Sequence, residues 1–237
     1  IKFNNLECKS FSSPRRSVTQ LNLAEIILRD STATDSTRIC LERFQTTITL
    51  NNDSVKGMIA WDDLGAVDHN KAKITGSYVP TSTGGRFNVS SANILLNDSL
   101  WTISPNNLVA FDDGRIRISN LALQSQRQYL GADGYVPTHT GDTLAVTLNR
   151  FNLATINFLL GSAGLEVGGL VSGEASVSDL QEDPTVFANL GIDHLGINGQ
   201  DYGDAVIFSQ WNNDESAVEI DMKLTDRKKD VFKLLGA

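Results

Sequence analysis

The sequence predicts an all-β protein, and two features of its pattern carry that prediction. Apolar and polar residues alternate over most of the 237 residues, as in strands that have one apolar and one solvated face. Clusters of Gly, Asn, Asp, Ser and Pro separate these runs at intervals of about 8 to 12 residues, a spacing typical of all-β folds. Because no clear linker or low-complexity segment interrupts the pattern, we expect a single β-rich domain over residues 1–237.

The first half of the chain predicts a series of strands. Residues 21–28 and 39–50 are expected to pair across a loop rich in Ser, Thr and Asp, with a bulge at 40–43. Residues 51–53 have the composition of a hairpin turn. Alternating runs then follow over residues 55–61, 72–80, 87–96 and 101–103.

A change of phase predicts a bulge farther along the chain. Ile116 and Ile118 alternate in one phase, whereas Leu121 and Leu123 alternate in the other. One extra residue in a strand shifts the phase in this way. A strand around residues 144–148 is then expected to lead into a helix.

Residues 152–160 form the one stretch with helical spacing. Leu153, Ile156 and Leu160 would share one face of the helix. Asn152 is suited to cap the N-terminus, and Gly161 is suited to end the helix. We therefore expect a short helix embedded in the sheet.

A long alternating strand is predicted directly after this helix, over residues 165–177. Gly169 and Gly173 fall on its apolar face, where glycine weakens a strand. Two explanations are open: tight packing of the preceding helix, or a channel widened for a ligand. Asp183 and Pro184 predict a turn, and a return strand follows over residues 186–192.

The order of these elements resembles the C-terminal region of TamB-type translocation and assembly module proteins, members of the AsmA-like group of bridge-like lipid transporters. The resemblance covers the second half of the chain, and the segment 112–133 is similar to the family's sequence before the helix. In the family an Asn often precedes the proline, where this chain has Asp183. The residues that carry the resemblance are Gly164, Gly168, Gly169, Gly173, Val177, Leu180 and Pro184.

The resemblance implies a fold that alternation alone does not select. It implies an elongated curved sheet folded into a half-pipe, the β-taco, with an apolar inside and a polar outside. Alternation fits a β-sandwich or a barrel equally well, and the sandwich remains the main alternative.

The resemblance also implies a function. The chain would be a non-enzymatic, periplasmic segment of an envelope-spanning protein that is anchored in the inner membrane outside this segment. It would offer an apolar groove for phospholipid transport and outer-membrane biogenesis. Its partners would be phospholipid acyl chains and an outer-membrane barrel protein of the assembly family. The candidate groove residues are Leu165, Val167, Val171, Val177, Val186, Leu190 and Ile192, and ordinary core packing is the other interpretation of each.

Charge and hydropathy limit the other partners. The formal net charge of −8 argues against nucleic acid or an anionic membrane surface. No apolar run approaches the 18 or so residues of a membrane-spanning helix. Because the chain opens on Ile1 and ends without an evident terminus, we expect it to be a piece of a longer polypeptide.

The sequence predicts neither catalysis, nor a metal site, nor a cofactor. The acidic pairs at 62–63 and 112–113 have the composition of turns, and the glycine-rich run at 161–173 lacks the Lys-Ser/Thr ending of a phosphate loop. Ser172 is expected to be a solvated strand serine, since its neighbours do not form a nucleophile elbow. The three histidines are far apart in sequence, and no metal-ligand spacing is present.

Several alternatives stay open. Cys8 and Cys40 could form a disulfide or remain two buried free thiols on separate strands. A closed β scaffold or protein-docking module without lipid binding is the second functional class. A carbohydrate-active enzyme on a β-helix or sandwich is the third, although the repeat that a β-helix requires is not found.

Overall fold

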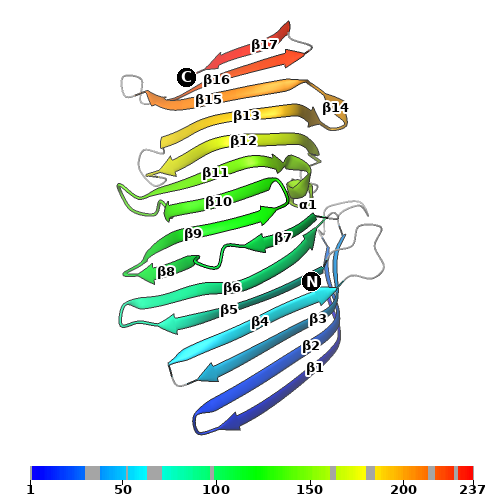
Figure 1. Ribbon diagram of the computed structural model, residues 1–237, viewed down its shortest axis with the longest axis vertical. Coiled ribbons are helices and arrows are strands. Elements are labelled where there is room, and N and C mark those ends of the chain that lie inside the picture. The colour runs from blue at the N-terminus through cyan, green and yellow to red at the C-terminus, as the bar shows by residue number, and fades with distance from the viewer. Residues whose placement is uncertain are drawn as a thin grey trace. The chain divides into compact units, whose positions relative to one another are not determined.

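The computed structural model describes residues 2–29, 38–51, 53–62, 71–96, 99–160, 164–179, 185–212, 217–226 and 229–236. Strands dominate all of these ranges (Figure 1), so the all-β prediction is confirmed. The chain divides into two compact units, Ile1–Gly114 with Leu123–Gln126, and Arg115–Ala122 with Arg127–Ala237. The single domain predicted over 1–237 stays a prediction.

The first unit is an antiparallel meander. From β1 to β6 each strand pairs with the next along the chain, and β6 then pairs with both β7 and β8. The strands are β1 Lys2–Ser13, β2 Arg16–Arg29, β3 Arg38–Asn51, β4 Ser54–Asp62, β5 Lys71–Pro80, β6 Gly84–Leu96, β7 Ser99–Ile103 and β8 Leu108–Asp112. The predicted pairing of residues 21–28 with 39–50 is confirmed as β2 and β3.

The second unit is also an antiparallel meander, which passes from β10 through β11, β12, β13, β15 and β16 to β17. Its elements are β9 Arg115–Ser125, β10 Gln128–Tyr135, β11 Thr143–Asn152, η1 Leu153–Ile156, α1 Asn157–Leu160, β12 Val167–Ser178, β13 Thr185–Ile197, β14 Gln200–Asp201, β15 Asp204–Asn212, β16 Ala217–Asp226 and β17 Lys229–Gly236. The last residues of β9 belong to the first unit. The pairings describe one sheet in each unit, whereas a sandwich stacks two; the half-pipe stays a prediction.

The predicted helix is present as a 3₁₀ turn, η1, followed by one turn of α-helix, α1. Asn152 is its N-cap as predicted, because its side chain accepts the backbone N–H of Ala154 at 3.0 Å. The Asn157 side chain both donates to and accepts from the backbone of Val167, each at 2.9 Å, which ties the helix to the start of β12. The predicted stop at Gly161 and the turn at 183–184 lie outside the described residues.

Strands β9, β11 and β13 each contain one residue with a left-handed backbone, at φ of 51°, 47° and 54°. Each of these residues donates its backbone N–H to a side-chain oxygen on another strand, at 2.8, 2.8 and 3.0 Å. The donor and acceptor pairs are Asn120 with Asp133, Arg150 with Ser172, and His194 with Asp204. The predicted phase change in β9 coincides with the first of these residues. Ser172 is therefore a structural acceptor rather than only a solvated serine.

The bulge predicted at 40–43 is not found. Arg43 has a left-handed backbone, with φ of 46°, yet the pairing register of β2 and β3 continues past it without a shift. A bulge requires two residues opposite one, and neither strand has an extra residue here.

The glycines on the apolar side of β12 are explained neither by packing of the helix nor by a widened channel, the two explanations that the sequence left open. Gly169 and Gly173 have φ of +118° and +134°, a backbone that side chains disfavour. A Cβ on Gly169 would lie 2.9 Å from the carbonyl oxygen of Asp193, and one on Gly173 would clash with the carbonyl of Asn189. Close approach of the β13 backbone therefore requires these glycines, rather than helix packing or a widened channel.

Replacing Gly173 by Ala should lower the free energy of unfolding by about 2 kcal/mol or more, since it combines positive φ with a backbone clash. Gly168→Ala is the matched control, because a Cβ at Gly168, in the same strand, meets nothing within 4 Å. Urea denaturation of both variants measures the difference. Equal midpoints for the two would contradict this explanation.

Candidate functional site

Apolar side chains of the second unit line up in rows across neighbouring strands, on one side of the sheet that we call the apolar face. Register makes these residues direct cross-strand neighbours. The middle row is Leu130, Leu148, Gly173, Leu190, Ile207 and Met222. On one side of it lies the row Ala132, Val146, Ala175, Ala188, Ser209 and Ile220. On the other side lies the row Phe151, Val171, Ile192, Ala205 and Leu224.

Burial differs between the rows of this face. In the row that starts at Phe151, the first four residues are buried, with Val171 at 3% and Ala205 at 1% exposure, and the last, Leu224, is half-buried. Phe151, the first residue of this row, is followed directly by Asn152 and η1, so the helix lies next to this row (Figure 1). At the far end Val186 is 36% and Ile220 is 42% exposed. Ala188 and Ser209, in the row of Ile220, are buried at 8% and 4%, whereas every residue of the middle row is half-buried. The apolar face is therefore partly exposed along its middle row and at single positions of its far end.

The structure brings the predicted groove residues of β12 and β13 onto this face. Val171 lies opposite Ile192, Val177 opposite Val186, and Leu190 opposite Gly173. Val171 and Ile192 are buried, and Val167, Val177 and Leu190 are half-buried. Leu165 precedes β12, is 36% exposed, and donates its backbone N–H to the Leu160 carbonyl at 3.3 Å. That these residues line a lipid groove stays a prediction.

Residues of flanking strands were missed by sequence reasoning. The run at 206–208 is apolar at every position, so alternation cannot show which residues face inward. The β13–β15 register places Ile207 opposite Leu190 on the apolar face, and puts Val206 and Phe208 on the other side. Only strand pairing carries that information.

The first unit has an apolar face of the same kind. Its rows include Trp61, Ala72, Ile94 and Trp101, and beside them Thr46, Ile59, Ile74 and Ala92. Ala72 and Trp101 are buried, whereas Ile48, Leu50 and Ile59 are 42% to 47% exposed. Each unit therefore combines a buried apolar region with a partly exposed one.

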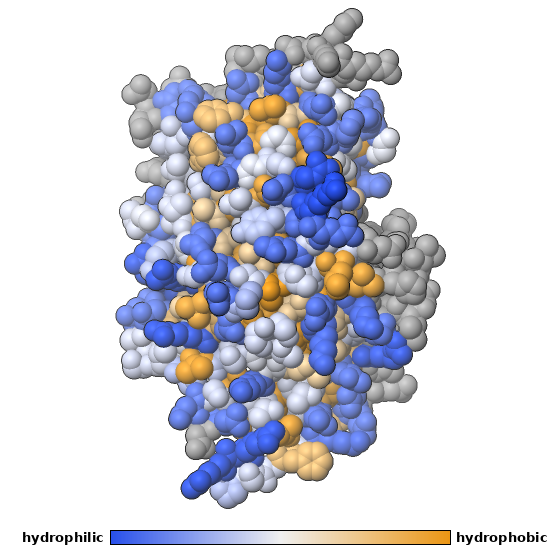
Figure 2. All heavy atoms as spheres, viewed as in Figure 1, coloured by the Kyte–Doolittle hydropathy of each residue, from blue (hydrophilic) through white to orange (hydrophobic). Residues whose placement is uncertain are grey.

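The opposite face of the second unit is mostly polar. Thr147, Glu174 and Asn189 lie in one cross-strand row, and Asp221 lies beyond them on β16. Figure 2 shows one face of the molecule on which hydrophilic residues predominate and hydrophobic residues form separate patches. The sheet of the second unit is therefore amphipathic.

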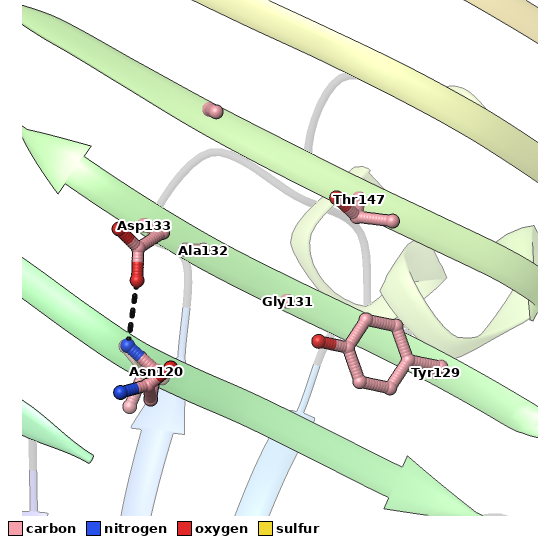
Figure 3. Close-up of a pocket in the computed structure, with 8 residues that line it drawn as sticks. Asn120, Tyr129, Gly131, Ala132, Asp133 and Thr147 are labelled. Atoms are coloured by element: carbon pink, nitrogen blue, oxygen red, sulfur yellow. Dashed lines mark hydrogen bonds between the residues drawn. The ribbon is translucent and has the colours of Figure 1, made fainter.

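A shallow pocket lies in the second unit, beside Tyr129 and Asp133 (Figure 3). The Tyr129 ring covers Gly131, where a Cβ would lie 2.5 Å from the phenol oxygen. Asp133 accepts the backbone N–H of Asn120 at 2.8 Å, so its carboxylate has a structural role. The lining residues are Asn120, Leu121, Tyr129, Gly131, Ala132, Asp133, Ala145 and Thr147; they include no histidine, serine or cysteine.

A buried carboxylate that the sequence did not single out lies just before β11. Asp142 is fully buried and accepts a hydrogen bond from the Arg115 guanidinium. This bond is the main cause that raises the pKa of Arg115. The guanidinium also lies 4.5 Å from the centre of the Tyr135 ring. The arrangement ties the connection between β10 and β11 to β9.

The acidic pairs have different settings. Asp113 and Gly114 form a tight turn with φ of 46° and 81°, which confirms the turn predicted at 112–113. Asp62 is the last residue of β4 and forms ion pairs with Arg43 at 3.0 Å and Lys71 at 3.6 Å; the turn predicted at 62–63 stays a prediction. Residue 63 lies outside the described residues.

Two of the three histidines lie within the described residues. His139 Nδ1 lies 3.6 Å from Asp142 Oδ2, and His194 occupies the irregularity of β13; His69 lies outside the described residues. Within the described ranges, no three His, Cys, Asp or Glu side chains form a group that could hold a metal ion. The described part of the chain also contains no helix long and apolar enough to span a membrane.

Cys8 is a free, exposed thiol, so it is not the buried thiol of one alternative. In the register of β2, Cys8 lies opposite Leu21, whereas Cys40 lies opposite Ile27. Six residues along a strand span about 20 Å, far beyond the separation that a disulfide allows. The two cysteines therefore cannot bridge each other in this sheet.

No family model matches the chain, and neither do curated proteins or solved structures. The fold and the site therefore define only the class of protein. It is an all-β protein in which an antiparallel sheet has one apolar and one mostly polar face.

Proposed function

We propose that the chain is a non-enzymatic segment whose apolar face, in the second unit, binds phospholipid acyl chains. The observation that carries the proposal is the middle row, whose residues from Leu130 to Met222 all stay partly exposed, together with Val186 and Ile220 at 36% and 42% exposure. Partly exposed apolar side chains that adjoin one another across neighbouring strands form a surface that an apolar ligand can cover. The similarity to TamB-type proteins supports the same function.

The energetics favour such a ligand. Each buried methylene contributes about 0.8 kcal/mol, so an acyl chain of about 16 carbons loses on the order of 12 kcal/mol on entering water. Rows that continue from β10 to β16 would let a chain move across strands without that loss at each step. A headgroup would remain at the solvated edge.

The resemblance supplies the biological setting of the proposal. On that basis the segment acts in phospholipid transport and outer-membrane biogenesis, in the periplasm, within a protein anchored in the inner membrane. An outer-membrane barrel protein of the assembly family would be its protein partner.

A photo-crosslinking amino acid at Ile220 should capture phospholipid when the protein is incubated with phospholipid vesicles. Lys223 is the matched control, because it is exposed in the same strand and lies on the opposite side of the sheet. We expect lipid adducts, measured by mass spectrometry, from position 220 and not from position 223. Val171 is unsuitable for this test because it is buried.

Two outcomes would reject the proposal. Equal adducts at 220 and 223 would indicate non-specific contact with the vesicle. No adduct at either position, with a folded protein, would favour the alternative of a closed β scaffold or docking module without lipid binding.

A further inference from the structure

Three large apolar side chains form a patch on the mostly polar side of the second unit, and we call it the aromatic patch. It consists of Phe187 on β13 and Phe208 and Val206 on β15, which are 39%, 37% and 53% exposed. The two rings meet edge to face, with centroids 6.0 Å apart. The patch is therefore one contiguous surface rather than scattered residues.

The patch is separate from the apolar face. Phe187 lies between Val186 and Ala188 in β13, and successive strand residues point to opposite sides. Its cross-strand neighbour is Ser176, while Phe208 lies between Asn189 and Asp221. Polar neighbours on both sides leave the rings without an apolar covering in the described strands.

The surroundings of the patch are acidic. Lys223, which lies directly opposite Val206 of the patch, is the only lysine or arginine between residues 167 and 226. The carboxylates on this side of β12 to β16 are Glu174, Asp193, Asp204, Glu219 and Asp221. Hydrogen bonds from Gln210 and then Asn212 lower the pKa of Glu219.

We propose that the aromatic patch is the docking site for a protein segment that carries alternating apolar and cationic side chains. Aromatic side chains at the centre of a patch with a polar rim are the usual anchors of protein interfaces. The acidic rim selects a cationic partner. The same rim, with a net charge of −8, disfavours a second copy of this chain and an anionic membrane surface.

The probe for this site is a fluorescent nine-residue peptide of alternating lysine and leucine, titrated against the full chain by fluorescence anisotropy. Its counterpart with glutamate in place of lysine is the charge control. We expect binding of the lysine peptide only, and a weaker affinity at high salt. The double variant Phe187→Ala and Phe208→Ala should weaken binding at least tenfold.

Two further variants test whether the peptide binds at the aromatic patch rather than elsewhere on the sheet. Ile220→Ala removes an equally exposed side chain from the opposite side and should leave the affinity unchanged. Glu174→Lys, at an exposed rim position next to Asn189, should weaken the lysine peptide and strengthen the glutamate peptide without removing any apolar contact. This variant tests the site even if the double variant folds poorly.

Three results would overturn the proposal. The first is an unchanged affinity in a folded Phe187→Ala and Phe208→Ala variant together with an unchanged charge preference in Glu174→Lys. The second is equal binding of both peptides. The third is self-association of the wild-type chain in sedimentation that Phe208→Ala abolishes, since the occupant would then be a second copy.

Discussion

Replacing Asn107 by Ala is expected to lower the free energy of unfolding by about 3 kcal/mol, because it leaves two buried backbone groups without partners. The Asn107 side chain is 2% exposed. It accepts the backbone N–H of Val89 at 2.8 Å and donates to the Val89 carbonyl at 2.7 Å. It therefore acts as a strand partner for β6 at the point where β7 has ended and β8 has not begun. Urea denaturation followed by circular dichroism measures the loss.

The neighbouring Asn106→Ala variant is the control, since Asn106 is exposed. It should change the free energy of unfolding by about 0.5 kcal/mol or less. If Asn107→Ala were as stable as Asn106→Ala, the two hydrogen bonds from the Asn107 side chain to the Val89 backbone would not contribute to stability.

Replacing Val171 by Asp is expected to destabilise the second unit by about 3 kcal/mol or more at pH 7. Val171 is 3% exposed and lies between Phe151 and Ile192, so the new carboxylate would be buried without a partner. Burial raises the pKa of such a carboxyl group above its unfolded value. The loss should therefore shrink as the pH falls below that raised pKa, because the neutral form is easier to bury.

Val186→Asp, on the same face but 36% exposed, should cost far less because water can reach the carboxylate. Thermal denaturation of both variants at pH 7 and pH 4.5 provides the comparison. Equal losses for the two at pH 7 would mean that the apolar face is covered as fully at Val186 as at Val171. That result would also count against an acyl-chain site there.

Local chemistry decided the features that the sequence predicted correctly. Alternation along the chain determines that strands form and, in β12, which side chains share a face. The same holds for the helix at 153–160, since Asn152 can cap it with a bond to Ala154, only two residues away. The turn at Asp113 and Gly114 likewise depends on adjacent residues that tolerate positive φ.

Features set by strand pairing could not be predicted from the sequence. The inward position of Ile207, between two equally apolar neighbours, follows from its register with Leu190. The bond between Asn107 and Val89 joins residues 18 positions apart. Sequence patterns report the period of a single strand, whereas these contacts depend on which residues lie opposite each other.

The candidate site divides in the same way. The sequence by itself determined that β12 and β13 carry an apolar side, because alternation of period two needs no partner strand. Tertiary structure alone decided that Val171 and Ile192 are buried while Val186 stays exposed. It also decided that the close approach of the Asn189 carbonyl requires glycine at position 173. The exposure of a side chain and the close approach of a backbone both depend on residues that are distant in the sequence. Alternation within one strand does not show which residues those are.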